Sequence, residues 1–305
     1  MIQGNIPEEA KNLKISKYDL EQILDKKIKV VFSALPPEIS LPIEQELAEN
    51  GIAVFSNSRA HRYDRDVPIL IPEVNPDHIL LIRNQLNKRK GFIITNANCS
   101  TTGLAIALKP LLKYRIKNIY VSTYQAISGA GYPGIPSLDI IGNIIPYIPG
   151  EEEKIIKETN KILGFYEDNK IRNNTLDIFP SCARVPVKEG HLESVFIEFE
   201  KDFRIEEIKK CFKNFKTNIN LHSSPDKPII ICENPYHPQP FLYNYQSKNN
   251  TSPGMSIAIG RFQKQGKKLR FSLLVHNTIK GAAGNAILNA EFAVHKGYIK
   301  KDEGC

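Results

Sequence analysis

The chain has 305 residues, more than a single hydrophobic core usually organises, so we expect two structural units. Apolar residues make up 41% and charged residues 24%, and the longest apolar runs are strand-sized, which excludes a disordered chain and a membrane-spanning one. The formal net charge of +8 fits a protein that handles small anions as well as it fits a nucleic-acid partner. Because the lysines are dispersed, we expect no nucleic acid as a partner, and because the apolar runs are short, we expect no membrane.

Two features of the sequence indicate the compartment. The N-terminal segment MIQGNIPEEAKNLKIS is polar with early acids, so it lacks the basic and apolar regions of a secretory signal, and we expect a cytoplasmic protein. The cysteines at positions 99, 182, 211, 232 and 305 are scattered with no CxxC pair. This spacing argues against a zinc site and a disulfide framework, so we expect free thiols and no metal.

The first hundred residues have the element order of a parallel sheet. Apolar runs at 28–35 and 52–58 predict strands, and the segment 36–51, with Pro at its start and Gly at its end, predicts a helix between them. An amphipathic helix over 78–91 and a strand over 92–100 follow. Strand, helix and strand form the βαβ unit, so we expect the latter part of a doubly wound α/β sheet.

A nucleotide-binding turn is missing from this region. Doubly wound sheets normally begin with a strand, a glycine-rich turn and a helix N-terminus that receives a pyrophosphate, but no GxGxxG precedes Ile28. Residues 1–27 are too few and too polar to supply that unit. Either the chain starts late within a longer gene product, or it is a nucleotide-free relative.

The rest of the chain mixes helices and strands as an α+β domain does. We expect helices over 100–115, 151–164 and 204–215, strands over 118–128 and 194–200, and a hairpin of 255–262 and 269–277. A loop dense in Gly and Pro spans 128–149. The closing segment 282–298 predicts a helix that packs back on the first unit.

Cys99 is a candidate nucleophile because of where it lies. It stands between an apolar strand and a helix that opens with Ser100, Thr101 and Thr102. The positive field and free N–H groups of a helix N-terminus lower a thiol pKa. A lone cysteine is more often a buried packing residue, and the polar surroundings favour the reactive interpretation here.

A thiolate nucleophile needs a base, and His191 is the best placed of the seven histidines. It follows Gly190 at a junction between loop and strand, near Arg184. Nothing local fixes the distance between His191 and Cys99, so the spacing alone supports the pairing weakly.

Five strings occur in a specific order: NANCSTTGL, QAISGAGYPGIPSLD, GEEEKIIKETNKILG, CARVPVKEGH and HNTIKGAAGNAIL. Together they resemble aspartate-semialdehyde dehydrogenases of the archaeal and fungal type, from about Ile28 to Ile299. The resemblance implies a partial Rossmann domain over 1–97, a glyceraldehyde-phosphate-dehydrogenase-like catalytic and dimerisation domain over 98–275, and a returning C-terminal helix over 276–305. What the chain lacks is the family's N-terminal Gly-rich loop.

The resemblance also implies a reaction and its residues. The family reduces L-aspartyl 4-phosphate with NADPH through a thioacyl enzyme, a step of amino-acid biosynthesis. Cys99 would be the nucleophile, His191 the acid and base, and Gln125 the residue that orients the acyl group.

Substrate contacts are implied in the same way. Arg184 would hold the α-carboxylate with its planar fork of donors, Glu151 would face the ammonium, and Lys154, Asn98 and Arg62 would contact the phosphate. Without the resemblance, an acidic helix start such as EEEK is ordinary capping.

The implied cofactor is NADP, and the implied assembly is a homodimer or homotetramer that takes a small anionic substrate and phosphate. Contacts to the nicotinamide half would come from Ser33, Ala34, Leu35, Ser128, Gly129, Gly131 and Asn277. Ligands do bind at the carboxyl ends of parallel strands, where the first of these residues lie.

Two alternatives stay open. Malonyl-CoA reductase uses the same scaffold and thioacyl step on a substrate without an ammonium, and the strings SNSRAHRYD, GYPGIPS and PGMS resemble it. Glu151 and Lys154 favour the amino-acid substrate. The second alternative is a truncated, cofactor-free remnant that only dimerises, which the missing Gly-rich turn supports.

Overall fold

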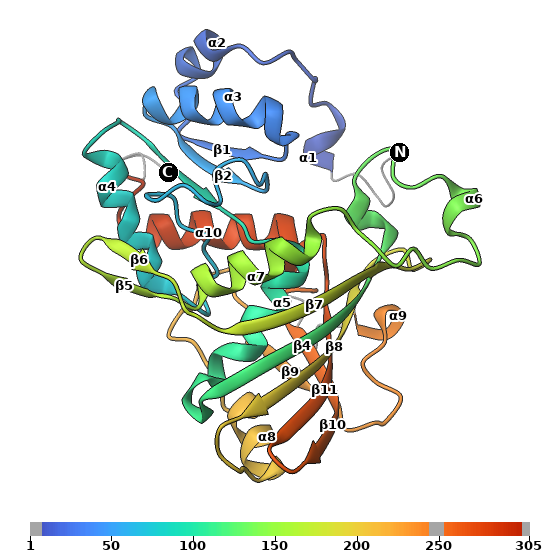
Figure 1. Ribbon diagram of the computed structural model, residues 1–305. Coiled ribbons are helices and arrows are strands. Elements are labelled where there is room, and N and C mark those ends of the chain that lie inside the picture. Colours follow the sequence, from blue (N-terminus) through green and yellow to red (C-terminus); the bar gives the residue numbers. More distant parts are fainter. Residues whose placement is uncertain (1–7, 244–252, 301–305) are drawn as a thin grey trace.

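The computed structural model describes residues 8–243 and 253–300, and these form two main sheets with helices between and around them (Figure 1). The first sheet contains three parallel strands in the order β1 (Val30–Ser33), β2 (Ala53–Ser56) and β3 (Phe92–Thr95). The predicted crossover helix is α3 (Pro37–Glu49). Before β1, residues 8–29 contain only the short helices α1 (Glu8–Lys11) and α2 (Leu20–Asp25).

Helices cover both faces of the first sheet because its strands are apolar on both sides. Val54 and Ile93 pack with Leu47 of α3. Phe55 and Phe92 face the other way and pack against α10 (Gly284–His295). The predicted return of the C-terminal helix to this sheet is therefore confirmed.

The second sheet has six strands in the order β7, β4, β8, β11, β10 and β9. Their bounds are β4 (Ile116–Gln125), β7 (Asp177–Arg184), β8 (His191–Phe199), β9 (Ile229–Ile231), β10 (Ile257–Gln265) and β11 (Lys268–Val275). Apolar side chains of its inner face pack against α5 (Cys99–Leu108), α7 (Glu151–Ile162) and α8 (Ile205–Lys213) in one large core. A parallel sheet and a mixed sheet, each with helices, confirm the expected fold class.

The topology of this sheet brings three predicted site residues to one edge. Strand β4 runs parallel to β7, and their last residues, Gln125 and Arg184, are register partners. Strand β8 runs antiparallel to β4, so its first residue, His191, lies at the same edge. Since alternate residues of a strand share a face, all three side chains belong to the buried inner face.

Shorter elements connect these parts. They are η1 (Pro76–Leu81), α4 (Ile82–Leu86), η2 (Lys109–Tyr114), η3 (Ile127–Ala130), α6 (Ser137–Ile140), β5 (Phe165–Glu167), β6 (Lys170–Arg172), α9 (Pro240–Tyr243) and the π-helical η4 (Ile279–Ala283). In Figure 1 the loop that carries α6 extends outward from the second sheet.

Several predicted elements have different bounds in the structure. The helix expected over 100–115 ends at Leu108 and continues as a 3₁₀ turn, because Pro110 has no N–H for the α-helical ladder. The helix expected over 78–91 is the 3₁₀ segment η1 followed by the five-residue α4. Strand β7 was not predicted. It contains Pro180, which an edge strand tolerates.

Candidate active site

The thiol of Cys99 and the imidazole of His191 lie against each other. Sγ of Cys99 is 3.1 Å from Nε2 of His191, although 92 positions separate them in the chain. Cys99 is the first residue of α5, and Asn98 caps this helix by accepting hydrogen bonds from the N–H groups of Ser100 and Thr101. The pairing that spacing could not fix is thus present in the folded chain.

The expected lowering of the thiol pKa is wrong. Burial raises the pKa of Cys99 to about 12, and the charge of Glu151 acts in the same direction. The backbone N–H of Ser100 and the charges of Arg62 and Arg184 lower this pKa by less. Loss of water around the sulfur therefore outweighs the field of the helix N-terminus, and the thiol is protonated at neutral pH.

Neighbours, and not acidity, distinguish Cys99 from the other cysteines. Cys99, Cys182 and Cys211 are free thiols, as expected, while Cys305 lies outside the described residues. Burial raises the pKa of Cys182 to about 12 as well. Only the contact with His191 gives Cys99 a partner suited to thioacyl chemistry.

The backbone of Ala126 fixes the hydrogens of His191. The N–H of Ala126 lies 3.0 Å from Nδ1, and because an amide N–H only donates, Nδ1 accepts and the ring hydrogen is on Nε2, facing Cys99. Burial lowers the pKa of His191 to about 3, with Arg184 acting in the same direction. The carbonyl of Ala126 accepts from Nη1 of Arg184 at 2.7 Å. A neutral imidazole therefore donates toward the sulfur.

A buried carboxylate joins three more of the predicted residues. Oε1 of Glu151 accepts from Asn98 at 2.7 Å and from Gln125 at 3.1 Å, and Oε2 accepts from Lys154 at 3.0 Å. Burial acts to raise the pKa of Glu151, but the charge of Lys154 and the bond from Asn98 outweigh it, so the pKa is lowered. Glu151 is therefore ionised at neutral pH, next to the residue that precedes the nucleophile.

Arg62 reaches this cluster from the loop that follows β2, and it is buried. Nη1 donates to Glu158 at 2.9 Å and Nη2 donates to the carbonyl of Asn57 at 3.0 Å. The second oxygen of Glu158 accepts from the backbone N–H of Asn98 at 2.6 Å. Sequence reasoning missed Glu158. The available signal was its place seven residues after Glu151, on the same face of α7.

Two glycines allow the backbone to approach the reactive side chains closely. A Cβ at Gly129 would lie 2.8 Å from Nη1 of Arg184 and 3.0 Å from Nε2 of His191. A Cβ at Gly281 would lie 2.7 Å from Cβ of Cys99. Gly281, which the sequence analysis did not single out, therefore contributes to the shape of the site.

The residues expected to hold the cofactor fall into two groups. In the first group, Ser33 ends β1, and Ala34 and the exposed Leu35 follow it. The Oγ of Ser33 is buried and has no hydrogen-bond partner within the described residues. In the second group, Asn277 donates to Oγ of Ser128 at 2.8 Å and accepts from the N–H of Gly190 at 2.8 Å. Gly129 belongs to the turn that Ser128 opens, and this second group adjoins His191.

Gly131 closes that turn with a φ of 72°. This left-handed backbone conformation favours glycine. A Cβ at Gly131 would meet open space, so the left-handed backbone of the turn, and not a close contact, favours glycine here.

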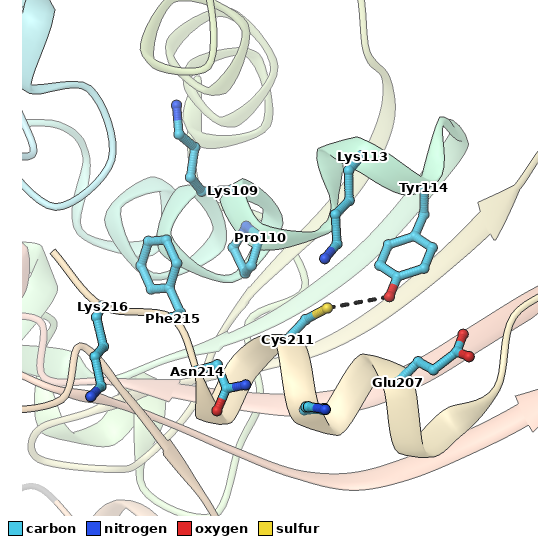
Figure 2. A pocket seen from close by; sticks show the side chains of 10 residues that line it. Lys109, Pro110, Lys113, Tyr114, Glu207, Cys211, Asn214, Phe215 and Lys216 are labelled. Carbon is cyan, nitrogen blue, oxygen red and sulfur yellow. Dashed lines mark hydrogen bonds between the residues drawn. The ribbon is translucent and has the colours of Figure 1, made fainter.

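A separate hollow between η2 and α8 shares no residue with this cluster. Its volume is about 590 Å³, and Figure 2 shows the bond of 3.2 Å between Oη of Tyr114 and Sγ of Cys211. Lys113 points toward Cys211, whereas Lys109 points away from it. No histidine lines the hollow, so it lacks the base that Cys99 has.

The chain matches two protein-family models. Residues 2–82 match the NAD binding domain of semialdehyde dehydrogenases, and residues 108–280 match their dimerisation domain. The match to the first model begins well before Ile28, so the resemblance extends further toward the N-terminus than the five motifs indicated.

Similar proteins and structures agree with the family models. The aspartate-semialdehyde dehydrogenase of Archaeoglobus fulgidus is 42% identical over 98% of this chain and 85% of its own length. The malonyl CoA reductase (NADP) of Metallosphaera sedula is 37% identical over the same shares of the two chains. The crystal structure of aspartate semialdehyde dehydrogenase with NADP from Candida albicans has a TM-score of 0.87 and 33% identity, covering 98% of this chain and 86% of that one.

Proposed function

Because this chain belongs to the aspartate-semialdehyde dehydrogenase family, we propose that the cluster around Cys99 performs that family's reaction. The reaction is the NADP-dependent reductive dephosphorylation of L-aspartyl 4-phosphate to L-aspartate 4-semialdehyde, and the chain is an oxidoreductase of amino-acid biosynthesis. The contact of 3.1 Å between Cys99 and His191 carries the assignment of residues. Sγ forms a bond to the acyl carbon, the bond from that carbon to the phosphate oxygen breaks, and phosphate leaves with the electron pair.

His191 handles the hydrogen at the sulfur. Once Nε2 has taken the thiol proton, the Nε2–H stabilises the thiolate and then the oxygen of the tetrahedral species as a hydrogen-bond donor. To accept the thiol proton, the ring must carry a hydrogen on Nδ1, which now accepts from Ala126. Proton transfer to Nε2 therefore requires the other tautomer of His191, in which the hydrogen is on Nδ1 and the Ala126 N–H no longer donates to it.

The substrate's charged groups match the charges around the cluster. Arg184 donates one N–H group to the carbonyl of Ala126. Its other N–H groups suit the α-carboxylate of the substrate. The ionised Glu151 suits the ammonium, with Gln125 beside it to orient the acyl group. Lys154, Asn98 and Arg62 are the groups that we assign to the phosphate. Asn98 and Lys154 both donate to Glu151, and Arg62 donates to Glu158.

The residues expected to hold NADP fit that cofactor. The unpartnered buried Oγ of Ser33 can bond a polar group of a ligand, and the Ser128 turn and Asn277 lie beside His191. Ala34 and Leu35 follow Ser33 in the chain, and Gly131 closes the Ser128 turn, so we assign them to the same two groups of cofactor contacts. When bound, NADPH supplies the hydride that reduces the thioester. The NAD binding domain match favours this assignment over a cofactor-free remnant.

Malonyl-CoA reductase is the second candidate function, supported by the similar protein of that name. The observation against it is the buried, ionised Glu151, which a substrate without an ammonium does not need. Initial rates with aspartate semialdehyde, phosphate and NADP, and with malonyl-CoA and NADPH, separate the two. We expect the first activity to dominate, and turnover of malonyl-CoA alone would overturn the proposal.

A homodimer through the outer face of the second sheet completes the proposal. Phe179 on β7, Tyr120 on β4 and Phe196 on β8 form one cross-strand row on that face, and all three are exposed. These strands fall within the residues that match the dimerisation domain.

Within the described residues no helix is long and apolar enough to cross a membrane. The cytoplasmic location stays a prediction.

A further inference from the structure

Helix α7 carries a stripe of charged side chains that the proposed reaction uses only in part. Glu151, Lys154, Glu158 and Lys161 are spaced by three, four and three residues, so they share one face of the helix. The first two belong to the proposed substrate site. Glu158 is completely buried and Lys161 nearly so, although charged residues are seldom buried unless they are paired.

Glu158 joins two parts of the site that follow neighbouring strands of the first sheet, β2 and β3. One carboxylate oxygen accepts from the Arg62 guanidinium at 2.9 Å, and the other accepts from the backbone N–H of Asn98 at 2.6 Å. Arg62 lies in the loop after β2, and Asn98 immediately precedes Cys99. Both oxygens are therefore occupied, one by each side of the site.

Lys161 holds the same loop by a separate means. Its Nζ donates to the carbonyls of Arg62, Asp64 and Val67 at 2.7, 3.0 and 2.8 Å. These bonds fix the course of the backbone but do not touch the guanidinium. The direction in which the Arg62 fork points thus depends on Glu158 and on the carbonyl of Asn57.

Of the three guanidinium nitrogens of Arg62, Nη1 and Nη2 bond to acceptors within the described residues and Nε does not. This Nε is buried. A guanidinium whose Nη1 and Nη2 are held by fixed acceptors presents its remaining N–H groups in a set direction, which suits an oxygen of a phosphate.

We propose that Glu158 is a positioning residue for phosphate: it fixes the Arg62 fork relative to Cys99 by bonding both the guanidinium and the Asn98 backbone. The proposal rests on the phosphate-binding role of Arg62 proposed above. It adds that this role depends on Glu158, which itself touches neither substrate nor cofactor.

The test uses protection of Cys99 by inorganic phosphate, which needs no turnover. The alkylation rate of Cys99 by iodoacetamide is measured by peptide mapping over a range of phosphate concentrations, and the half-protecting concentration is compared among variants. Glu158→Gln keeps the shape of the side chain but replaces one carboxylate oxygen with an NH₂ group. Either the Arg62 guanidinium or the Asn98 N–H then faces a donor and loses its acceptor. We expect the half-protecting concentration to rise about tenfold, the effect of one lost charge-assisted hydrogen bond.

Glu153→Gln is the matched control, because it removes one exposed carboxylate from the same helix. It should leave phosphate protection unchanged. Alkylation without phosphate and the thermal midpoint report folding, and a merely structural role for Glu158 would change these and not the half-protecting concentration. If Glu158→Gln does not fold, Glu158→Asp, which keeps the charge on a shorter stem, should shift protection in the same direction by a smaller factor.

Arg62→Met separates the two levels of the proposal. It should weaken protection by phosphate, and adding Glu158→Gln to it should cause no further loss, since the two residues act through one contact. Normal protection in Arg62→Met would overturn the role of Arg62. If phosphate protects Cys99 less well in Arg62→Met but as well as before in Glu158→Gln, only the role of Glu158 is overturned.

Discussion

Both members of the proposed reactive pair, Cys99 and His191, are uncharged in the folded chain. The sequence pointed to Cys99 because it lies between a strand and a helix, and to His191 because it lies where a loop meets a strand. Whether a thiol is ionised depends on the water left around it, which is set by segments far away in the chain. Burial raises the pKa of Cys99 and lowers that of His191, so both are neutral.

Replacement of His191 by Asn tests whether the imidazole moves a proton. An asparagine amide can still donate toward the sulfur but cannot serve as acid or base. We expect kcat to fall by about 10²–10⁴, the range for a lost general acid–base, with little change in KM. A loss below about tenfold would show that His191 acts only as a hydrogen-bond donor.

Glu193 makes the stability of the fold depend on pH. It is completely buried two residues after His191, and neither carboxylate oxygen has a hydrogen-bond partner within the described residues. Burial raises its pKa well above the usual value of 4.5, and the charge of Glu151 acts in the same direction. The folded chain thus keeps a proton that the unfolded chain releases, so stability falls as pH rises above that value.

The slope from this one group is about 1.4 kcal/mol per pH unit until the folded-state pKa is reached. Glu193→Gln should remove this part of the slope in urea unfolding measured from mildly acidic to neutral pH. Glu206→Gln, at an exposed position, is the control and should leave the slope unchanged. An unaltered slope in Glu193→Gln would mean that the carboxyl is ionised in the folded chain.

Among the elements, helices α3, α7 and α8 were predictable because their patterns are local. The edge of the second sheet where β4 and β7 end and β8 begins was not predictable. Arg184 joins Gln125 and His191 only because β7 pairs with β4, and β7 escaped prediction. Its pattern of alternate burial is clear in the structure, but Pro180 and short polar residues obscure it in the sequence. Strand pairing depends on residues distant in the chain, which local periodicity does not report.

Helix α7 stabilises the loop after β2 through Lys161. Lys161→Met leaves three carbonyls without their donor, so we expect the free energy of unfolding in urea to fall by about 3 kcal/mol or more. Lys157→Met removes an exposed lysine from the same helix and should change it by less than about 0.5 kcal/mol. Equal effects of the two changes would contradict the role given to Lys161.

For the molecule as a whole, the two sheets and the returning helix were predictable from the order of elements and the five motifs. The outer face of the second sheet was not, because an exposed aromatic row becomes visible only when β7, β4 and β8 are placed side by side. Phe179 has 73% of its surface exposed, and its ring centroid lies 6.4 Å from that of Tyr120. Exposed aromatic clusters of this kind are typical of protein interfaces.

A charge on this face should prevent self-association. We expect Phe179→Glu to shift the protein from dimer toward monomer in sedimentation velocity, because a carboxylate would have to be buried without a partner. Phe165→Glu places the same charge on an exposed phenylalanine of β5 and should leave the dimer intact. A Phe179→Glu protein that remains a dimer would place the interface elsewhere.

The formation of a thioacyl bond on Cys99 is the central claim, and it can be measured without turnover. The protein is mixed with L-aspartyl 4-phosphate in the absence of NADPH, quenched in acid and mapped by mass spectrometry of its peptides. We predict an aspartyl adduct on the peptide that contains Cys99, formed together with phosphate release and absent from Cys99→Ala. An adduct on another cysteine, or phosphate release by Cys99→Ala at the normal rate, would contradict the account.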